Sequence, residues 1–340
     1  MTMSGTESTT AAEVGPDGPG PSVQEPEASG RRSRRAFAEE YAIVWVTVVA
    51  LIVASLVSSD FLTSTNIENV LSQNAPLGLV AIGMTFVMIA GGFDLSAGAQ
   101  VGACTVVAAT LSNHYSTGVA IVGTVLAGAL AGAFNGVLIT VLRINAFVAT
   151  LATGSIFTGV ALLYTKSTTI PITDSGFAVI GAGKVFGLRT SAVIVVVLFV
   201  VLGFLLAKSV YGRSLYAVGG NDVAARLAGL RVDLLRGSTY TLVGVGCGAA
   251  GLIYASLFAT GDPGTGVSIT LDAITVVIIG GTSLYGGAGA MWRTAVGLIL
   301  LSTITNVFDL LAIESSWQLV TKGAVLLLAV GLDLAQRRSR

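Results

Sequence analysis

The sequence has few charged residues for its length. Only 11% of its 340 residues are Asp, Glu, Lys or Arg, whereas soluble globular chains carry roughly 25%. Apolar residues make up 53%, and the mean hydropathy is +0.84. This shortage of charge excludes a soluble enzyme and a nucleic-acid-binding protein. It predicts an all-α polytopic membrane protein, because apolar stretches of about 20 residues cross a bilayer as helices.

Cysteine, histidine and nucleotide-binding motifs are also scarce. Cys104 and Cys247 both lie in apolar stretches, which excludes a disulfide framework, and His114 is the single histidine, which excludes a multi-histidine metal site. The pair Gly183-Lys184 lacks the glycine and the Ser or Thr of a Walker motif. We therefore expect no cofactor on this chain. If ATP and Mg²⁺ drive its function, separate ATPase subunits must bind them.

The apolar stretches predict about ten transmembrane helices with both termini in the cytoplasm. The expected spans are 41–58, 67–90, 96–112, 118–141, 145–165, 190–207, 238–260, 271–281, 294–311 and 317–335. The range 271–281 is too short to cross alone, so we expect a broken or tilted helix there. Arginines just before the first span and after the last one favour this orientation under the positive-inside rule.

Hydrophilic segments divide the chain further. Residues 1–36 are rich in Ser, Gly, Pro and Glu and predict a disordered cytoplasmic tail, followed by a transmembrane domain over 37–340. The segment 166–189 is expected to cover the external mouth. The segment 208–237 is the largest cytoplasmic loop after the tail and carries several arginines.

Polar side chains within the apolar stretches are the candidates for a solute path. They are Asn74, Asp94, Ser96, Asn135 and Asn306. Such groups are costly in hydrocarbon, so they mark water-lined paths, helix caps or interhelical hydrogen bonds. Asp94 and Asp272 both suit N-caps, and we expect Lys322 to pair with Asp309 or Glu314. No spaced chain of acidic residues crosses the membrane, which weakens a proton-driven mechanism.

Glycine patterns predict close helix packing and a possible repeat. Gly128, Gly132 and Gly136 fall on one face of a helix, where they allow another helix to approach closely. The stretch Ala81–Gly98 resembles Ala273–Gly287, since each has an apolar run, a Gly-Gly break and a glycine-rich turn. This match fits an internal duplication or a coincidence of composition.

The cytoplasmic loop contains a short capped helix. Asn221 or Asp222 can cap it, Val223, Leu227 and Leu230 form an apolar stripe, and Gly229 can end it or allow a close contact. An exposed helix with apolar and basic residues suits a docking element for a partner, although an ordinary loop is the alternative. The predicted docking residues are Asn221, Asp222, Val223, Ala224, Ala225, Arg226, Leu227, Gly229 and Arg231.

Four ordered motifs resemble those of the ribose-type permeases, the membrane subunits of bacterial ABC importers for sugars. They lie at Gly83–Gly98, Asn145–Leu151, Tyr211–Gly229 and Leu271–Gly289. Branched-chain amino-acid permeases are more distant relatives. The segment Ala224–Gly229 looks like the coupling helix that docks on the ATPase, although Val223 replaces the glutamate of the better-known Glu-Ala-Ala form.

The resemblance implies several partners. They are two cytoplasmic ABC ATPase subunits, an extracytoplasmic solute-binding protein, a second permease copy that forms a homodimer, and the lipid bilayer, with no nucleic acid. The permease itself is expected in the plasma membrane of a bacterium. The expected function is translocation of a monosaccharide or a similar small polar solute by alternating access. The alternatives are an autonomous secondary transporter or channel, and an ABC permease for branched-chain amino acids.

Overall fold

The computed structural model describes residues 29–185 and 187–338, and it confirms a polytopic all-α chain. Its helices are α1 Ser29–Val57, α2 Ser64–Gln73, α3 Ala75–Ile89, α4 Ala97–His114, α5 Thr117–Thr140, α6 Ala146–Thr165, α7 Val179–Ala182, α8 Thr190–Lys208, α9 Val210–Gly220, α10 Asp222–Leu227, α11 Val232–Phe258, α12 Ile269–Ile279, α13 Met291–Leu310 and α14 Ser315–Arg338. The chain divides into a short unit, Met1–Tyr41, and a large one, Ala42–Arg340, with the boundary inside α1. Most of the predicted tail, residues 1–28, lies outside the described residues.

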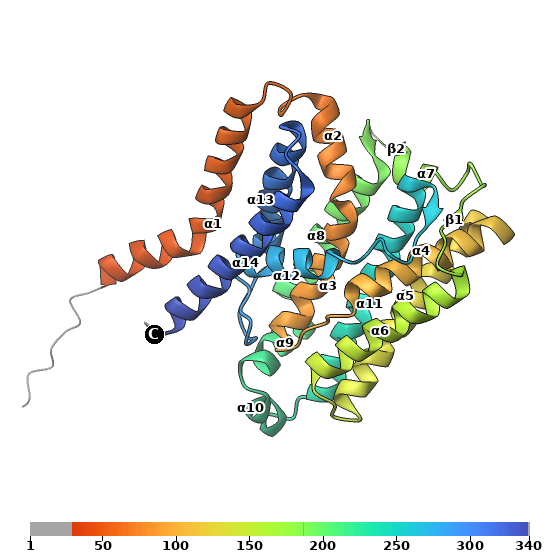
Figure 1. Cartoon of the computed structure of the whole chain (residues 1–340). Helices are drawn as coiled ribbons and strands as arrows, with labels where there is room; N and C mark the ends of the chain where they lie inside the picture. The colour runs from red at the N-terminus through yellow and green to blue at the C-terminus, as the bar shows by residue number, and fades with distance from the viewer. Residues whose placement is uncertain (1–28, 186, 339–340) are drawn as a thin grey trace, which may run out of the picture. The chain divides into compact units, whose positions relative to one another are not determined.

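Short strands occur in the connections of the large unit. β1 Ile170–Pro171 pairs antiparallel with β4 Thr260–Gly261, and β2 Lys184–Val185 pairs antiparallel with β3 Leu188–Arg189. Figure 1 shows β2 and α7 at one end of this unit and α10 at the other. The segment 166–189 and the loop 208–237, which contains α10, therefore lie at opposite ends of this unit.

Five of the described helices are long and apolar enough to cross a membrane: α5, α6, α8, α11 and α13. α2 and α3 together form either a sixth span, broken by a bend of 45°, or a re-entrant loop. The sequence predicted one unbroken span over 67–90, but Asn74 ends α2 and Pro76 stands in the first turn of α3. Proline lacks the N–H that would continue the hydrogen-bond ladder, so the helix bends at that place.

The core is built around α3 and α11. Every residue of α3 is buried, and it packs against α8, α11, α12 and α13. The outward faces of α5, α6 and α8 expose large apolar side chains such as Leu130, Leu163 and Phe204. In water such a surface would favour aggregation, whereas in a bilayer it contacts lipid tails.

The predicted glycine seam is confirmed on α5, where it contacts α11. A Cβ on Gly136 would lie 2.8 Å from the Gly237 carbonyl oxygen, and a Cβ on Gly132 would overlap the Tyr240 carbonyl oxygen. Cys104 and Cys247 are buried free thiols, as expected.

Replacing Gly132 with valine is expected to destabilise the chain strongly, because the backbones of α5 and α11 would have to separate. Thermal unfolding in detergent measures this effect. Gly159→Val on the neighbouring α6 is the control, since a Cβ on Gly159 meets nothing within 4 Å. Equal losses of stability in the two variants would show that the seam is not tight.

Candidate translocation path and coupling helix

The predicted docking helix is present as α10. The side chain of Asn221 is its N-cap and accepts a hydrogen bond of 2.9 Å from the Ala224 backbone N–H. Gly229 follows the helix with φ of +82°, a left-handed conformation that glycine adopts without strain, so it ends the helix. The sequence allowed either Asn221 or Asp222 as the cap, and Asn221 is the residue that caps the helix. Gly229 ends the helix, which is one of the two roles expected for it.

The exposed surface of α10 carries both apolar and charged side chains. Val223 is 64% exposed and Leu227 is 85% exposed, whereas Ala225 is buried against Val218 and Val232. The expected apolar stripe is wrong at Leu230, which lies beyond the end of the helix and packs inward against the buried cluster. Val223 and Leu227 are therefore the large apolar side chains that α10 exposes.

Arg226 forms an ion pair next to that surface. Its guanidinium donates to both carboxylate oxygens of Asp233 on α11, at 2.9 and 2.5 Å. This hydrogen bonding raises the pKa of Arg226, so the side chain stays cationic. The other predicted coupling residues, Ala224 and Arg231, are exposed beside it. The prediction of a short helix that faces solvent is therefore confirmed, whereas its role in docking a partner stays a prediction.

Asp94, Ser96 and Asn135 come together in one buried polar cluster. All three are 0% exposed, and Gln100, which the sequence analysis did not single out, joins them at 1%. Asp94 accepts hydrogen bonds from the Ser96 backbone N–H at 2.9 Å and from Gln100 at 3.2 Å. Asn135 donates to the Ser96 hydroxyl at 2.7 Å and to Asp94 at 3.4 Å.

This cluster stands where α4 begins. The N-cap residue of α4 is Ser96 rather than Asp94, but Asp94 does accept one backbone N–H there, and its carboxyl group lies at the N-terminal end of the helix. Because the cluster is completely buried, a solute would have to displace the surrounding segment to reach it. The proposed contact with solute stays a prediction.

Asn74 and Asn306 lie apart from this cluster. Asn74 donates to the Val70 carbonyl oxygen at 2.9 Å, at the bend between α2 and α3. Asn306 exchanges two hydrogen bonds of 2.9 Å with Asn66. Both side chains therefore make the structural contacts that the sequence analysis held open as the alternative to a solute path.

A groove borders the start of α4. It has a volume of about 630 Å³ and is lined by residues of α4, α6 and the segment leading into α12. Its polar groups are the hydroxyls of Ser155, Thr158 and Thr270. Thr270 accepts a hydrogen bond of 2.7 Å from the Gly98 backbone N–H, so it joins the first turns of α4 and α12. Neutral hydroxyl groups of this kind can hydrogen-bond a polar solute that carries no charge.

A second cavity, of about 600 Å³, lies beside the coupling helix. Arg143, Arg226 and Arg236 line it together with Asp233 and Tyr240, and Gly91 and Gly92 form part of its wall. We call it the basic cavity, and we call the space beside α4 the α6 groove. Neither space was predicted from sequence, since both are assembled from helices that are distant along the chain.

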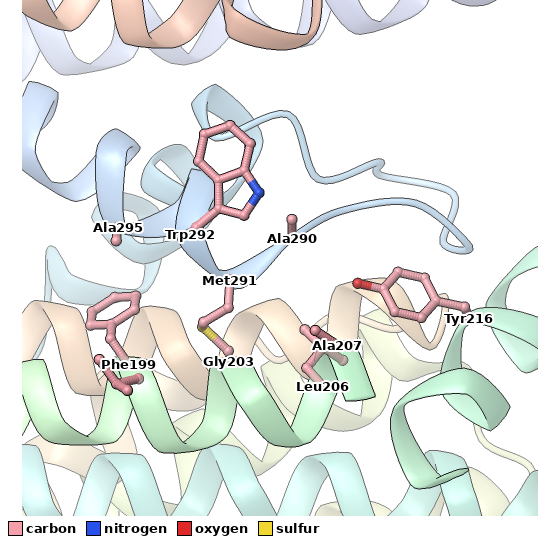
Figure 2. A pocket seen from close by; sticks show the side chains of 10 residues that line it. Phe199, Gly203, Leu206, Ala207, Tyr216, Ala290, Met291, Trp292 and Ala295 are labelled. Carbon is pink, nitrogen blue, oxygen red and sulfur yellow. The ribbon is translucent and has the colours of Figure 1, made fainter. Parts of the chain in front are cut away.

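Figure 2 shows a third, apolar pocket of about 350 Å³ between α8 and the start of α13. Phe199, Met291 and Trp292 line it, and the Tyr216 hydroxyl at its edge donates to the Gly289 carbonyl oxygen at 2.8 Å. None of the predicted site residues is in its lining, which is mostly apolar.

The buried lysine of α14 has a different partner from the one predicted. Lys322 forms an ion pair of 2.8 Å with Asp272 of α12, not with Asp309 or Glu314. Asp272 is the fourth residue of α12, so it is not the N-cap; Ser268 occupies that position. Asp309 accepts instead from Gln318 at 2.8 Å. A buried charge takes the partner that is close in space, and sequence distance does not reveal it.

The comparisons with known proteins agree with this arrangement. Residues 66–330 match the family described as branched-chain amino acid transport system / permease component. The chain belongs to this permease family. It is 40% identical to the ribose import permease protein RbsC of Bacillus subtilis (strain 168), over 84% of this chain and 89% of that protein.

Two further relatives are similar over most of their length. The L-arabinose ABC transporter permease protein AraH of Azospirillum brasilense is 37% identical, over 88% of each chain. RbsC of Escherichia coli (strain K12) is 33% identical, over 90% of this permease and 97% of the relative. No solved structure matches the permease. The matches to RbsC and AraH confirm the resemblance to ribose-type permeases.

Proposed function

We propose that this permease is the membrane subunit of a bacterial ABC importer and moves a monosaccharide across the plasma membrane by alternating access. Separate ATPase subunits supply the energy, and a solute-binding protein delivers the sugar at the opposite end. The proposed topology has ten crossings, with α10 and both termini in the cytoplasm. The named relatives support the substrate class, since they are permeases for ribose and for L-arabinose.

The exposed α10 carries this proposal. A helix of six residues cannot be stable alone, so its cap, its glycine stop and its buried Ala225 keep it in place while Val223 and Leu227 stay exposed. Such a rigid apolar surface suits the groove of an ATPase. Because ligands shift conformations only through differential contacts, ATPase movement must change the contacts of α10 between the two states.

The α6 groove is the proposed solute path. It is open along one side, and a second copy of the chain would enclose it. Ser155, Thr158 and Thr270 would exchange hydrogen bonds with sugar hydroxyls, while Leu95, Leu151 and other apolar side chains leave the solute weakly held. Weak binding favours release, and the binding protein then supplies most of the selectivity.

Reconstitution tests the proposal. The permease, its ATPase and its binding protein are incorporated into liposomes, and uptake of radiolabelled ribose, arabinose and leucine is measured with and without ATP. We expect ATP-dependent uptake of a sugar. Uptake of leucine alone would favour the amino-acid alternative, and uptake without ATP or ATPase would favour a secondary transporter or channel.

A further inference from the structure

The segment from Ala90 to Ser96 separates the two polar spaces. Gly91 and Gly92, at its beginning, line the basic cavity, whereas Leu95, near its end, lines the α6 groove. The segment connects α3 to α4 and so has no helical hydrogen-bond ladder of its own. A short displacement of this segment would therefore join the two spaces into one passage.

Contacts on both sides hold the segment closed. On the groove side, the Leu95 backbone N–H donates to the Thr150 hydroxyl of α6 at 3.1 Å. On the cavity side, Gly92 packs against the Tyr240 side chain so closely that a Cβ would lie 2.5 Å from its hydroxyl oxygen. Gly91 has φ of +77°, a left-handed backbone that ends α3 and gives the segment a hinge.

Arg236 links this hinge to the coupling helix. Its Nε donates to the Ala90 carbonyl oxygen at 3.3 Å, and its guanidinium lies 3.9 Å from the carboxylate of Asp222, the first residue of α10. Ala90 stands at the C-terminus of α3, where carbonyl groups lack helical partners. The Arg236 side chain therefore contacts both α10, the proposed docking helix, and Ala90, which precedes the hinge at Gly91.

Backbone contacts couple the same two elements. The Gly287 N–H donates to the Ile89 carbonyl oxygen at 2.9 Å, and a Cβ on Gly219 at the end of α9 would overlap that oxygen. α9 leads directly into Asn221, the cap of α10. Since no side chains separate these backbones, a displacement of α9, which leads into α10, would press directly on the end of α3.

We propose that residues 90–96 form the cytoplasmic gate between the α6 groove and the basic cavity, and that Arg236 is the positioning residue that makes this gate follow α10. The inference rests on the proposed function. In the closed state, Asp94, Ser96 and Asn135 fix the far end of the gate. When the ATPase moves α10, Asp222 and Arg236 move the Ala90 hinge, and the basic cavity becomes the exit.

The test combines transport with accessibility. Ser155 on the groove side is replaced by cysteine in a chain whose Cys104 and Cys247 are alanine. A membrane-impermeant thiol reagent is then added on the α10 side of proteoliposomes that hold the full complex, in each nucleotide state. In this single-cysteine chain with Arg236 unchanged, we expect Ser155→Cys to be labelled in only one nucleotide state, because the reagent must pass the gate.

Arg236→Gln is expected to lower sugar uptake at least tenfold while ATPase binding and hydrolysis persist, and labelling should no longer depend on nucleotide. Arg236→Lys should restore part of the uptake, and Arg213→Gln on α9 is the matched control, because Arg213 contacts the Lys208 carbonyl oxygen and not the gate. Normal uptake, or unchanged nucleotide-dependent labelling, in Arg236→Gln would overturn the proposal. A parent complex without ATP-driven uptake would instead contradict the proposed function.

Discussion

Replacing Leu227 with aspartate is expected to abolish ATP-driven uptake while the permease still folds in the membrane. Leu227 is 85% exposed on α10, so the core does not depend on it. Burying a leucine at an interface is worth about 1.5–3 kcal/mol, and each 1.4 kcal/mol is a tenfold change in affinity. Loss of that contact alone should weaken ATPase binding about 10- to 100-fold, and burial of the new charge adds to the loss.

Titration of the purified permease with its ATPase measures this affinity, and uptake into proteoliposomes measures the consequence. Leu227→Met is the matched control, since it retains an apolar side chain of similar volume and should keep both properties. Thermal unfolding in detergent should be the same for all three chains. If Leu227→Asp binds the ATPase as tightly as the parent chain, α10 is not the docking surface.

Local features were predicted well from sequence where the signal is local. Asn221 and Gly229 define α10 because capping and left-handed glycine geometry involve only neighbouring residues. The prediction for Leu230 was wrong because it assumed that the helix continues to this residue, whereas Gly229 ends the helix before it. The bend at Asn74 was missed because the strongly apolar α3 dominates the hydropathy of the whole stretch, although Pro76 signals a break there.

The suspected repeat shows how register depends on structure. The sequence aligned Gly91 with Gly280, whereas the left-handed residues are Gly91 and Gly281. In both places the backbone N–H three residues past the last helical residue donates to the carbonyl oxygen five residues earlier, Gly92 to Val87 and Thr282 to Val277. The two helices thus end in the same way, one residue out of step with the sequence match.

The candidate site could be predicted only in part, because its residues converge from distant segments. Asp94 and Ser96 are neighbours in sequence, but Asn135 reaches them from α5, and Gln100 was missed although it lies one helical turn beyond Ser96. Arg236 carries no sequence signal for its contact with Ala90, which is 146 residues away. A buried polar residue predicts that a partner exists, and the fold decides which residue it is.

The ion pair between Lys322 and Asp272 provides the second large effect. Both side chains are mostly buried, with 21% and 13% exposure, within helices that pack in the apolar part of the chain. Removing one partner from a buried pair leaves an uncompensated charge and typically costs about 3–5 kcal/mol. Lys322→Ala is therefore expected to lower the free energy of unfolding by that amount, and Asp272→Ala by a similar one.

A double-mutant cycle in detergent separates the pair from the packing of its members. Lys322→Ala combined with Asp272→Ala should recover most of the loss, because the double variant buries no unpaired charge. Asp309→Asn is the matched control: Asp309 was the partner expected from sequence, but it is exposed and bonds Gln318, so its replacement should cost well under about 1 kcal/mol. If Lys322→Ala lowers the free energy of unfolding no more than Asp309→Asn does, the Asp272 charge is neutralised in another way. The ion pair then does not fix the position of α14 against α12. Recovery in the double variant would show that the loss in the single variants comes from the unpaired charge left between α12 and α14, beside the first turn that Thr270 joins to the start of α4.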